Sequence, residues 1–220
     1  MIKLIVFDLD GTLLDTKPDL TGAMNYALSQ LGYEQISAEQ TRDYIGNGIK
    51  MFAKRAVSHS YETDTDDEVA DKAVALFKQY YAGHLVSNTV PYDGISELLY
   101  RLKEKGIRLA VLSNKYDDAT KYIIDHFFPD TFDRVYGESE ACPRKPDPAG
   151  FYLICNDLGI SPSDAVMVGD SPGDIKVAVA SGARHVSVAW GYRSREVLEG
   201  AGAYRIASDA DGLYDMLIEL

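Results

Sequence analysis

Short runs of valine, isoleucine and leucine alternate with helix-type patterns from about residue 88 onward. The runs lie at residues 107–114, 134–137, 165–170 and 184–190, and another apolar run precedes Asp8 near the N-terminus. Strands that alternate with helices of about ten residues form βαβ units, whose parallel sheet is buried on both faces. We therefore predict an α/β fold, with a Rossmann-like parallel sheet at the centre of a three-layer αβα core.

Residues 17–86 contain no convincing strand pattern. Apolar residues at three- and four-residue spacing from Leu20 to Leu31 predict a helix that stops at Gly32. Capping-box patterns, in which Ser or Thr precedes Gln or Glu by three residues, predict further helix starts at Ser37 and Thr65.

This segment indicates an all-helical unit inserted into the α/β core. The predicted core domain comprises residues 1–15 and 88–220, and the predicted helical cap domain comprises residues 16–87. The linkers at 15–18 and 87–94 both contain residues typical of turns.

Polar side chains follow three of the predicted strands at the point where each strand ends. They are Asp8 and Asp10 after the first strand, Ser113 and Asn114 after the second, and Asp170 after the fourth, with Asp174 one helical turn later. Ligand sites in parallel sheets lie at the carboxyl ends of the strands. If these strands are neighbours, we expect three carboxylates, a hydroxyl and an amide to converge there.

Carboxylates that lie close together repel one another unless a cation is bound between them. Mg²⁺ fits such a site because it prefers oxygen ligands and is usually held by one or two carboxylates together with substrate phosphate. Two alternative interpretations explain these residues by backbone geometry alone, without a metal. Asp10 followed by glycine is typical of a hairpin turn, and residues 168–174 are typical of a helix start, with Ser171 as N-cap and Asp174 in the first turn. The helix-start interpretation leaves Asp170 unexplained.

Lys145 precedes a proline, which favours an extended backbone at the lysine. A lysine fixed in a loop before the helix that leads to Asp170 can act as a point charge on phosphate. The alternative is an ordinary solvated surface lysine. Arg144 is a weaker candidate for the same role.

The charge balance narrows the classes of partner. The 220 residues include 34 acidic and 22 basic side chains, which give a formal net charge of -12. Such a balance disfavours sequence-independent binding to nucleic acid or to an anionic membrane. The N-terminus resembles neither a signal peptide nor a transmembrane span, so we expect a cytoplasmic protein. Cys142 and Cys155 lack metal-type spacing and are interpreted as reduced thiols.

Taken in chain order, four motifs of this sequence resemble those of the haloacid dehalogenase-like hydrolases. They are DLDGT at 8–12, SN at 113–114, KP at 145–146 and GDSPGD at 169–174, and the helical insert is similar to the cap domain of that superfamily. GNGIK at 46–50, PYDG at 91–94 and WGYRS at 190–194 look like the phosphoglycolate phosphatase branch. Asp at position 10 favours a phosphatase or phosphomutase over the dehalogenases and ion pumps of the superfamily.

The resemblance implies a role for each motif residue. Asp8 would be the nucleophile that forms an aspartyl-phosphate, and Asp10 would be the general acid and base. The implied ligands of Mg²⁺ are the Asp8 side chain, the Asp10 backbone carbonyl and Asp170.

The remaining motif residues are implied to act on phosphate or on the groups around the metal. Ser113 and Asn114 would donate hydrogen bonds to phosphate oxygens, and Lys145 would neutralise them. Asp174 would orient a metal-bound water or the lysine.

The expected function is that of a magnesium-dependent phosphatase acting on a small phosphorylated metabolite, with 2-phosphoglycolate as the first candidate. Inorganic pyrophosphatase, nucleotidase, pyridoxal-phosphate phosphatase and sugar-phosphate phosphatase activities stay open. A phosphomutase is disfavoured because the related mutases carry a histidine shortly after the first motif, where DTKPDLTGAMNY has none. A binding protein with a decayed site is disfavoured because no motif residue is missing. We expect a monomer or homodimer.

Overall fold

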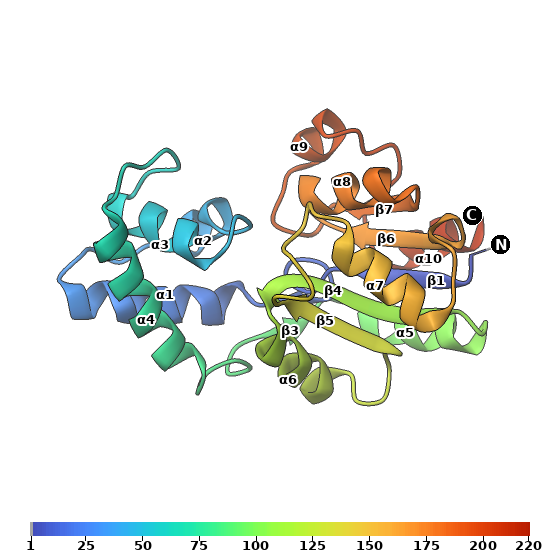
Figure 1. Cartoon of the computed structure of the whole chain (residues 1–220), viewed down its shortest axis with the longest axis horizontal. Coiled ribbons are helices and arrows are strands. Elements are labelled where there is room, and N and C mark those ends of the chain that lie inside the picture. The colour runs from blue at the N-terminus through green and yellow to red at the C-terminus, as the bar shows by residue number, and fades with distance from the viewer. Residues whose placement is uncertain (1) are drawn as a thin grey trace. The chain divides into compact units, whose positions relative to one another are not determined.

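The structure is a computed structural model that describes residues 2–220 (Figure 1). The chain divides into two compact units. Pro91–Leu220, together with the N-terminal residues up to Asp15, form the larger unit, and Thr16–Val90 form the smaller one.

A parallel sheet forms the centre of the larger unit. Within residues 2–220 it has six strands in the order β5-β4-β1-β6-β7-β8. The strands are β1 (Leu4–Phe7), β4 (Arg108–Tyr116), β5 (Arg134–Glu138), β6 (Ala165–Gly169), β7 (Arg184–Val188) and β8 (Ile206–Ala207). β2 (Leu14–Asp15) and β3 (Val90–Pro91) form a separate two-stranded sheet.

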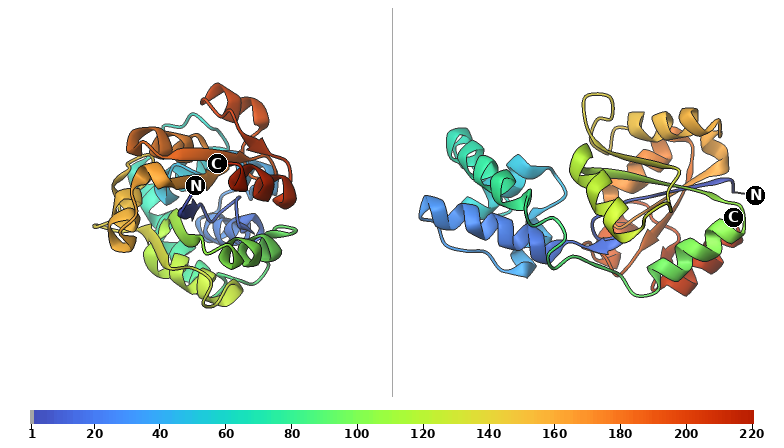
Figure 2. Two further views of the ribbon diagram at one scale, coloured as in Figure 1. Left: turned by 90° about the vertical axis from the view of Figure 1, so that its right-hand side faces the viewer. Right: turned by 90° about the horizontal axis from the view of Figure 1, so that it is seen from below.

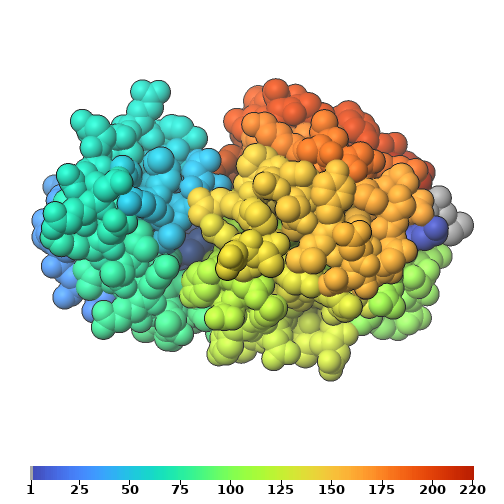
Figure 3. Space-filling view, in the orientation of Figure 1, coloured from blue at the N-terminus to red at the C-terminus, as the bar shows by residue number. Residues whose placement is uncertain are grey.

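Helices cover both faces of the larger sheet (Figure 2). They are α5 (Ile95–Glu104), α6 (Asp117–Phe127), α7 (Ala149–Leu158), α8 (Pro172–Ser181), α9 (Arg195–Gly200) and α10 (Ala210–Ile218), with a 3-10 turn at Pro162–Asp164. α7 and α8 pack together on one face, and their atoms form part of the surface seen in the space-filling view (Figure 3). α5 and α10 pack together on the other. All four residues of β1 are fully buried, as expected for a strand covered on both faces. The predicted three-layer α/β fold is therefore confirmed.

The strand register brings three strand ends to the same level. Phe7 pairs with Val111 of β4 and with Val168 of β6. The residues that follow these three positions therefore emerge at one edge of the sheet. β4 continues to Tyr116, two residues beyond the predicted end, and its register with β5 shifts between Leu112 and Tyr116. Such a bulge bends the strand and redirects its side chains.

The smaller unit is built from helices. Within residues 16–90 these are α1 (Lys17–Leu31), α2 (Ala38–Tyr44), α3 (Ile49–Ser58) and α4 (Asp67–Tyr81). α1 and α3 both pack against α4. The capping box predicted at Ser37 is confirmed, because the Ser37 side chain accepts a hydrogen bond from the Gln40 backbone N–H and the Gln40 side chain accepts one from that of Ser37.

The helix start predicted at Thr65 is wrong by one residue. The N-cap of α4 is Asp66, whose carboxylate accepts a hydrogen bond from the Glu68 backbone N–H at 2.6 Å. Thr65 instead donates its hydroxyl to the backbone carbonyl of Lys54. A carboxylate caps a helix more favourably than a threonine because it also interacts with the positive end of the helix dipole.

The two cysteines are unpaired and buried, so the prediction of reduced thiols is confirmed. Burial raises the pKa of each thiol to about 11. Among the helices of residues 2–220, none has both the length and the apolar content that crossing a bilayer requires.

Asp19 in the first turn of α1 is buried and holds the segment at the end of the smaller unit. Its carboxylate accepts hydrogen bonds from the backbone N–H groups of Asn88 and Thr89, from the Asn88 amide and from the Thr89 hydroxyl, at 2.8 to 2.9 Å. The side chain therefore ties the beginning of the helical segment to its end.

We expect Asp19→Ala to lower the free energy of unfolding by about 3 kcal/mol, because several buried donors lose a charged acceptor. Urea denaturation monitored by circular dichroism measures this change. Asp43→Ala is the matched control, since the Asp43 side chain is 57% exposed and forms a surface ion pair with Arg42. An equal, small effect of both variants would contradict a structural role for Asp19.

Candidate active site

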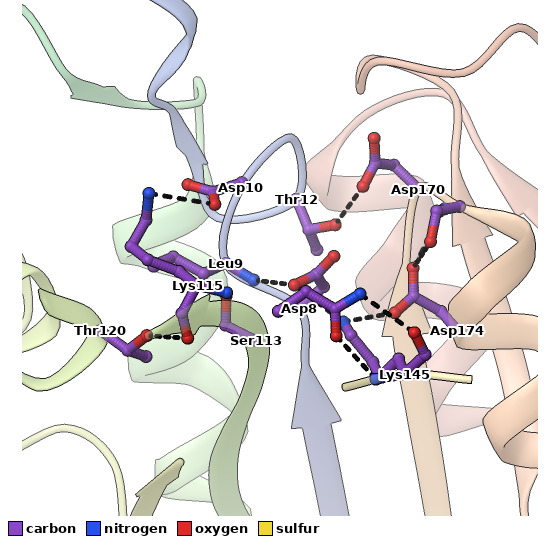
Figure 4. Close-up of polar contacts among 12 residues, drawn as sticks. Asp8, Leu9, Asp10, Thr12, Ser113, Lys115, Thr120, Lys145, Asp170 and Asp174 are labelled. Atoms are coloured by element: carbon purple, nitrogen blue, oxygen red, sulfur yellow. Dashed lines mark hydrogen bonds and ion pairs between the residues drawn. The ribbon is translucent and has the colours of Figure 1, made fainter. Parts of the chain in front are cut away.

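Asp8 stands directly after the buried strand β1 and is itself 8% exposed. Its backbone N–H donates to the Val168 carbonyl at 2.8 Å, which continues the pairing with β6. Its Oδ1 accepts a hydrogen bond from the Leu9 backbone N–H at 2.7 Å and lies 2.9 Å from Lys145 Nζ. The carboxylate is thus fixed in orientation next to a cation (Figure 4).

Lys145 reaches the strand ends from the loop before α7. Its Nζ lies 2.9 Å from Asp8 Oδ1 and 2.6 Å from Asp174 Oδ1, and its side chain is 2% exposed. The interpretation as a solvated surface lysine is therefore excluded. Burial alone would lower the pKa of Lys145, but the carboxylates of Asp174 and Asp8 reverse the effect and hold this pKa above its ordinary value. Lys145 consequently remains a cation at neutral pH.

Asn114 holds the backbone of Lys145. Its Oδ1 accepts from the Lys145 backbone N–H at 2.7 Å, and its Nδ2 donates to the Lys145 carbonyl at 3.1 Å. The sequence predicted a hydrogen bond from this amide to phosphate. In the structure both ends of the amide contact the loop that carries the lysine, so Asn114 orients Lys145. The other predicted cation of this loop, Arg144, pairs with Glu138 at 2.7 Å.

Asp174 belongs both to the helix start and to the site. Its Oδ2 accepts hydrogen bonds from the Ser171 backbone N–H at 3.0 Å and from the Ser171 hydroxyl at 2.6 Å, at the beginning of α8. Its Oδ1 contacts Lys145. The helix-start interpretation of residues 168–174 is therefore confirmed, and the same carboxylate also faces the active site.

Asp170 follows β6 and is held by two donors. Its Oδ2 accepts from the Tyr192 backbone N–H at 2.7 Å, and its Oδ1 accepts from the Thr12 hydroxyl at 3.2 Å. A Cβ on Gly191 would lie 2.5 Å from the Gly11 carbonyl and would also overlap Asp170. The absence of a side chain at Gly191 therefore lets this loop close over Asp170.

The carboxylates of Asp8, Asp170 and Asp174 form one buried cluster, with an oxygen of each lying within 4.8 Å of the others. Burial and, after it, the charge of Asp174 together raise the pKa of Asp170 to about 6, against the opposing effect of the hydrogen bond from the Tyr192 N–H. Burial also raises the pKa of Asp8, although Lys145 opposes the effect. Three buried carboxylates with one lysine leave excess negative charge. Oxygen ligands with this charge fit a hard divalent cation such as Mg²⁺.

Asp10 lies in the tight turn that follows β1. Gly11 adopts a left-handed φ of 84°, and its N–H donates to the Leu14 carbonyl at 3.0 Å. The hairpin interpretation is wrong, because β1 pairs in parallel with both β4 and β6. The DG dipeptide makes a turn here without an antiparallel strand pair.

The sequence reasoning missed Lys115, which contacts Asp10. The Lys115 side chain is 5% exposed, and its Nζ lies 3.2 Å from Asp10 Oδ2. Ser113 Oγ accepts a hydrogen bond from the Lys115 backbone N–H at 3.1 Å, which leaves the serine proton to act as a donor. Lys115 was detectable in principle, because it follows Ser113 by two residues, and residues two apart in a strand point to the same side.

Comparisons with known proteins point to one family. A model of the haloacid dehalogenase-like hydrolase family matches residues 5–188. Phosphoglycolate phosphatase 1 of Pseudomonas aeruginosa is 35% identical over 218 residues, covering 98% of this chain and 78% of that protein. The phosphoglycolate phosphatase of Vibrio parahaemolyticus is 35% identical over 224 residues, covering 100% and 94%. A crystal structure from Lactobacillus delbrueckii subsp. bulgaricus, provisionally described as a phosphoglycolate phosphatase, has a TM-score of 0.92 and 33% identity, covering 98% of each chain.

The chain therefore belongs to the haloacid dehalogenase-like hydrolases, on their phosphoglycolate phosphatase-like branch. The resemblance predicted from the motifs is confirmed, and so is the enzyme class, a hydrolase of phosphoric monoesters.

The raised pKa of Asp170 predicts a pH-dependent stability of the metal-free protein. The folded state holds the Asp170 proton up to about pH 6, whereas an unfolded aspartate loses it near about pH 4. The free energy of unfolding therefore falls as the pH rises through this window, and Asp170→Asn removes this contribution. In the presence of a metal chelator, we expect the free energy of unfolding of the variant to exceed that of the wild type by up to about 3 kcal/mol at neutral pH.

Urea denaturation in the presence of a chelator at about pH 5 and about pH 7 tests this prediction. The gain in free energy of unfolding of the variant over the wild type should be larger at about pH 7. Asp211→Asn is the control, because the Asp211 side chain is 88% exposed. An advantage of the same size at both pH values would contradict the assignment.

Proposed function

We propose that this chain is a magnesium-dependent phosphatase that hydrolyses a small phosphorylated metabolite through an aspartyl-phosphate on Asp8. The observation that carries the proposal is the buried Asp8 carboxylate, 2.9 Å from Lys145 Nζ and clustered with Asp170 and Asp174. A fixed nucleophile beside a permanent cation and a set of hard oxygen ligands supplies what phosphoryl transfer requires. The relatives named phosphoglycolate phosphatase make 2-phosphoglycolate the first candidate substrate.

In the first step, an oxygen of Asp8 attacks phosphorus and the bond from phosphorus to the ester oxygen breaks. The ester oxygen takes a proton from the Asp10 carboxyl group and leaves as an alcohol. Lys145 and the Ser113 hydroxyl stabilise the negative charge on the phosphate oxygens. Asn114 contributes by holding Lys145 in place.

In the second step, water attacks the phosphorus of the aspartyl-phosphate while the Asp10 carboxylate takes a proton from it. The bond between phosphorus and the Asp8 oxygen breaks, which restores the Asp8 carboxylate and releases phosphate. Asp10 ends the cycle in its protonated form, ready for the next ester.

Mg²⁺ bound in this site would neutralise negative charge on the phosphate and on the carboxylates. We propose the Asp8 side chain, the Asp10 backbone carbonyl and Asp170 as its ligands. Asp174 then orients Lys145 and the groups around the metal, because one of its oxygens contacts Lys145 and the other accepts from Ser171. A cytoplasmic location and a monomeric or homodimeric state are part of the same proposal.

Two substitutions separate the roles of the aspartates. Asp8→Asn removes the nucleophile, so we expect turnover of p-nitrophenyl phosphate to fall by a factor on the order of 1,000 or more. Asp10→Asn keeps the nucleophile but loses the base of the second step, so we expect turnover to fall by roughly 100-fold or more. Because nitrophenolate leaves without a proton, this variant should release a burst of nitrophenol stoichiometric with enzyme and then turn over slowly.

Rapid-quench kinetics in the presence of Mg²⁺ measures the burst. Precipitating the protein in acid, after reaction with an ester whose phosphate is labelled, detects the phosphoenzyme. Asp125→Asn, on the exposed side of α6, is the matched control and should behave as the wild type. Full turnover by Asp8→Asn would overturn the proposed mechanism.

A substrate panel tests the choice of metabolite. We expect the highest kcat/KM for 2-phosphoglycolate when phosphate release is compared among 2-phosphoglycolate, pyrophosphate, a nucleoside monophosphate, pyridoxal phosphate and a sugar phosphate. A higher value for another compound would identify the corresponding alternative activity. Conversion of a hexose 1-phosphate to its 6-phosphate isomer without release of phosphate would indicate a phosphomutase instead.

A further inference from the structure

Lys115 is a second buried cation of the active site that the proposed mechanism leaves without a role. Its side chain is 5% exposed, and its Nζ lies 3.2 Å from Asp10 Oδ2. Lysine is seldom buried to this extent, because removing an ammonium group from water is costly unless it is paired. A lysine retained at such a position needs a reason in the chemistry of the site.

The two lysines lie beside different catalytic carboxylates. Lys145 contacts Asp8 and Asp174, where the transferred phosphoryl group must bind. Lys115 contacts Asp10, on the opposite side of Asp8 in the close-up (Figure 4). If Asp10 protonates the leaving oxygen, its carboxyl group must come within hydrogen-bonding distance of that oxygen. The carbon atoms attached to this oxygen then lie on the same side of Asp8 as Lys115.

The backbone around Lys115 is held from three directions. Its N–H donates to Ser113 Oγ at 3.1 Å, and its carbonyl accepts from the Thr120 hydroxyl at 3.2 Å. A Cβ on Gly137 would lie 2.5 Å from the same carbonyl, so β5 can approach only because this residue lacks a side chain. These contacts fix the bulged end of β4 and orient the lysine before any ligand binds, which favours specific recognition.

We propose that Lys115 is a specificity-determining residue that binds a second anionic group of the substrate, carried by the leaving group close to the ester oxygen. An ammonium group has three N–H donors, so contact with Asp10 is compatible with contact to a carboxylate. The preferred substrate class is then a phosphate ester of a short hydroxy acid, and an ester with a neutral leaving group is a poor substrate. This inference rests on the proposed phosphatase function and on the role of Asp10 within it.

The test compares two esters that differ in one charged group. 2-Phosphoglycolate carries a carboxylate where 2-hydroxyethyl phosphate carries a neutral alcohol. We expect the wild type to prefer 2-phosphoglycolate, and we expect Lys115→Met to reduce the ratio of the two kcat/KM values by roughly 10- to 100-fold. Most of the loss should appear in KM, because the carboxylate is bound alike in the ground state and in the transition state.

Lys121→Met is the matched control, since Lys121 lies on the neighbouring helix α6 with 54% of its side chain exposed and pairs with Asp117. It should keep the ratio of the wild type. An equal loss on both esters in Lys115→Met would overturn the inference and assign Lys115 to the positioning of Asp10. An unchanged ratio would overturn it as well.

A measurement on the wild type keeps the inference testable even if Lys115→Met does not fold. Hydrolysis of both esters with no preference for 2-phosphoglycolate would overturn the inference while the phosphatase function stands. Hydrolysis of neither ester, nor of any other phosphate ester, would instead overturn the proposed function itself. The two failures are therefore distinguishable.

Discussion

The active site depends on the buried contact of the Lys145 ammonium with the carboxylates of Asp8 and Asp174. Without this cation, the buried carboxylates would repel one another with less opposing charge from the protein. The lysine is itself held by Asn114 through two hydrogen bonds to its backbone. This network of ion pairs and hydrogen bonds thus connects β1, β4, the loop before α7 and the start of α8.

This arrangement also explains why the site can be anionic and still bind phosphate. The chain as a whole has a formal net charge of -12. Within the site, positive charge comes from two lysines that are almost fully buried. In a buried site an ammonium group acts over a short distance with little screening by solvent, so each of these lysines has a strong local effect in an otherwise acidic protein.

Much of the core and of the site was predictable from the sequence, because the strands of this fold are short, apolar and followed directly by polar residues. Asp8 and Asp170 each stand just after a strand end, Ser113 lies within β4, and the register of β1 with β4 and β6 brings these three positions to one edge. Lys145 was predictable only as part of the ordered motifs, since a single lysine before a proline is equally compatible with the protein surface.

The errors have two physical sources. Strand partners come from distant parts of the chain, so only the pairing of β1 with β4 and β6 excludes the hairpin that the DG dipeptide left open as an alternative. Local geometry at element ends was the second source. The β4 strand runs two residues further than predicted, and the contacts of Asn114 with Lys145 and of Lys115 with Asp10 lie in this irregular part of the strand. At the start of α4 the adjacent Thr65 and Asp66 are both capable caps, and the carboxylate is the one used.

The double use of Asp174 has a consequence for how this enzyme can change during evolution. One oxygen caps α8 and the other contacts the active-site lysine, so a substitution there alters folding and chemistry together. A change at Asp174 is therefore expected to lower stability and activity at once, so new substrate preferences are expected to arise at other positions.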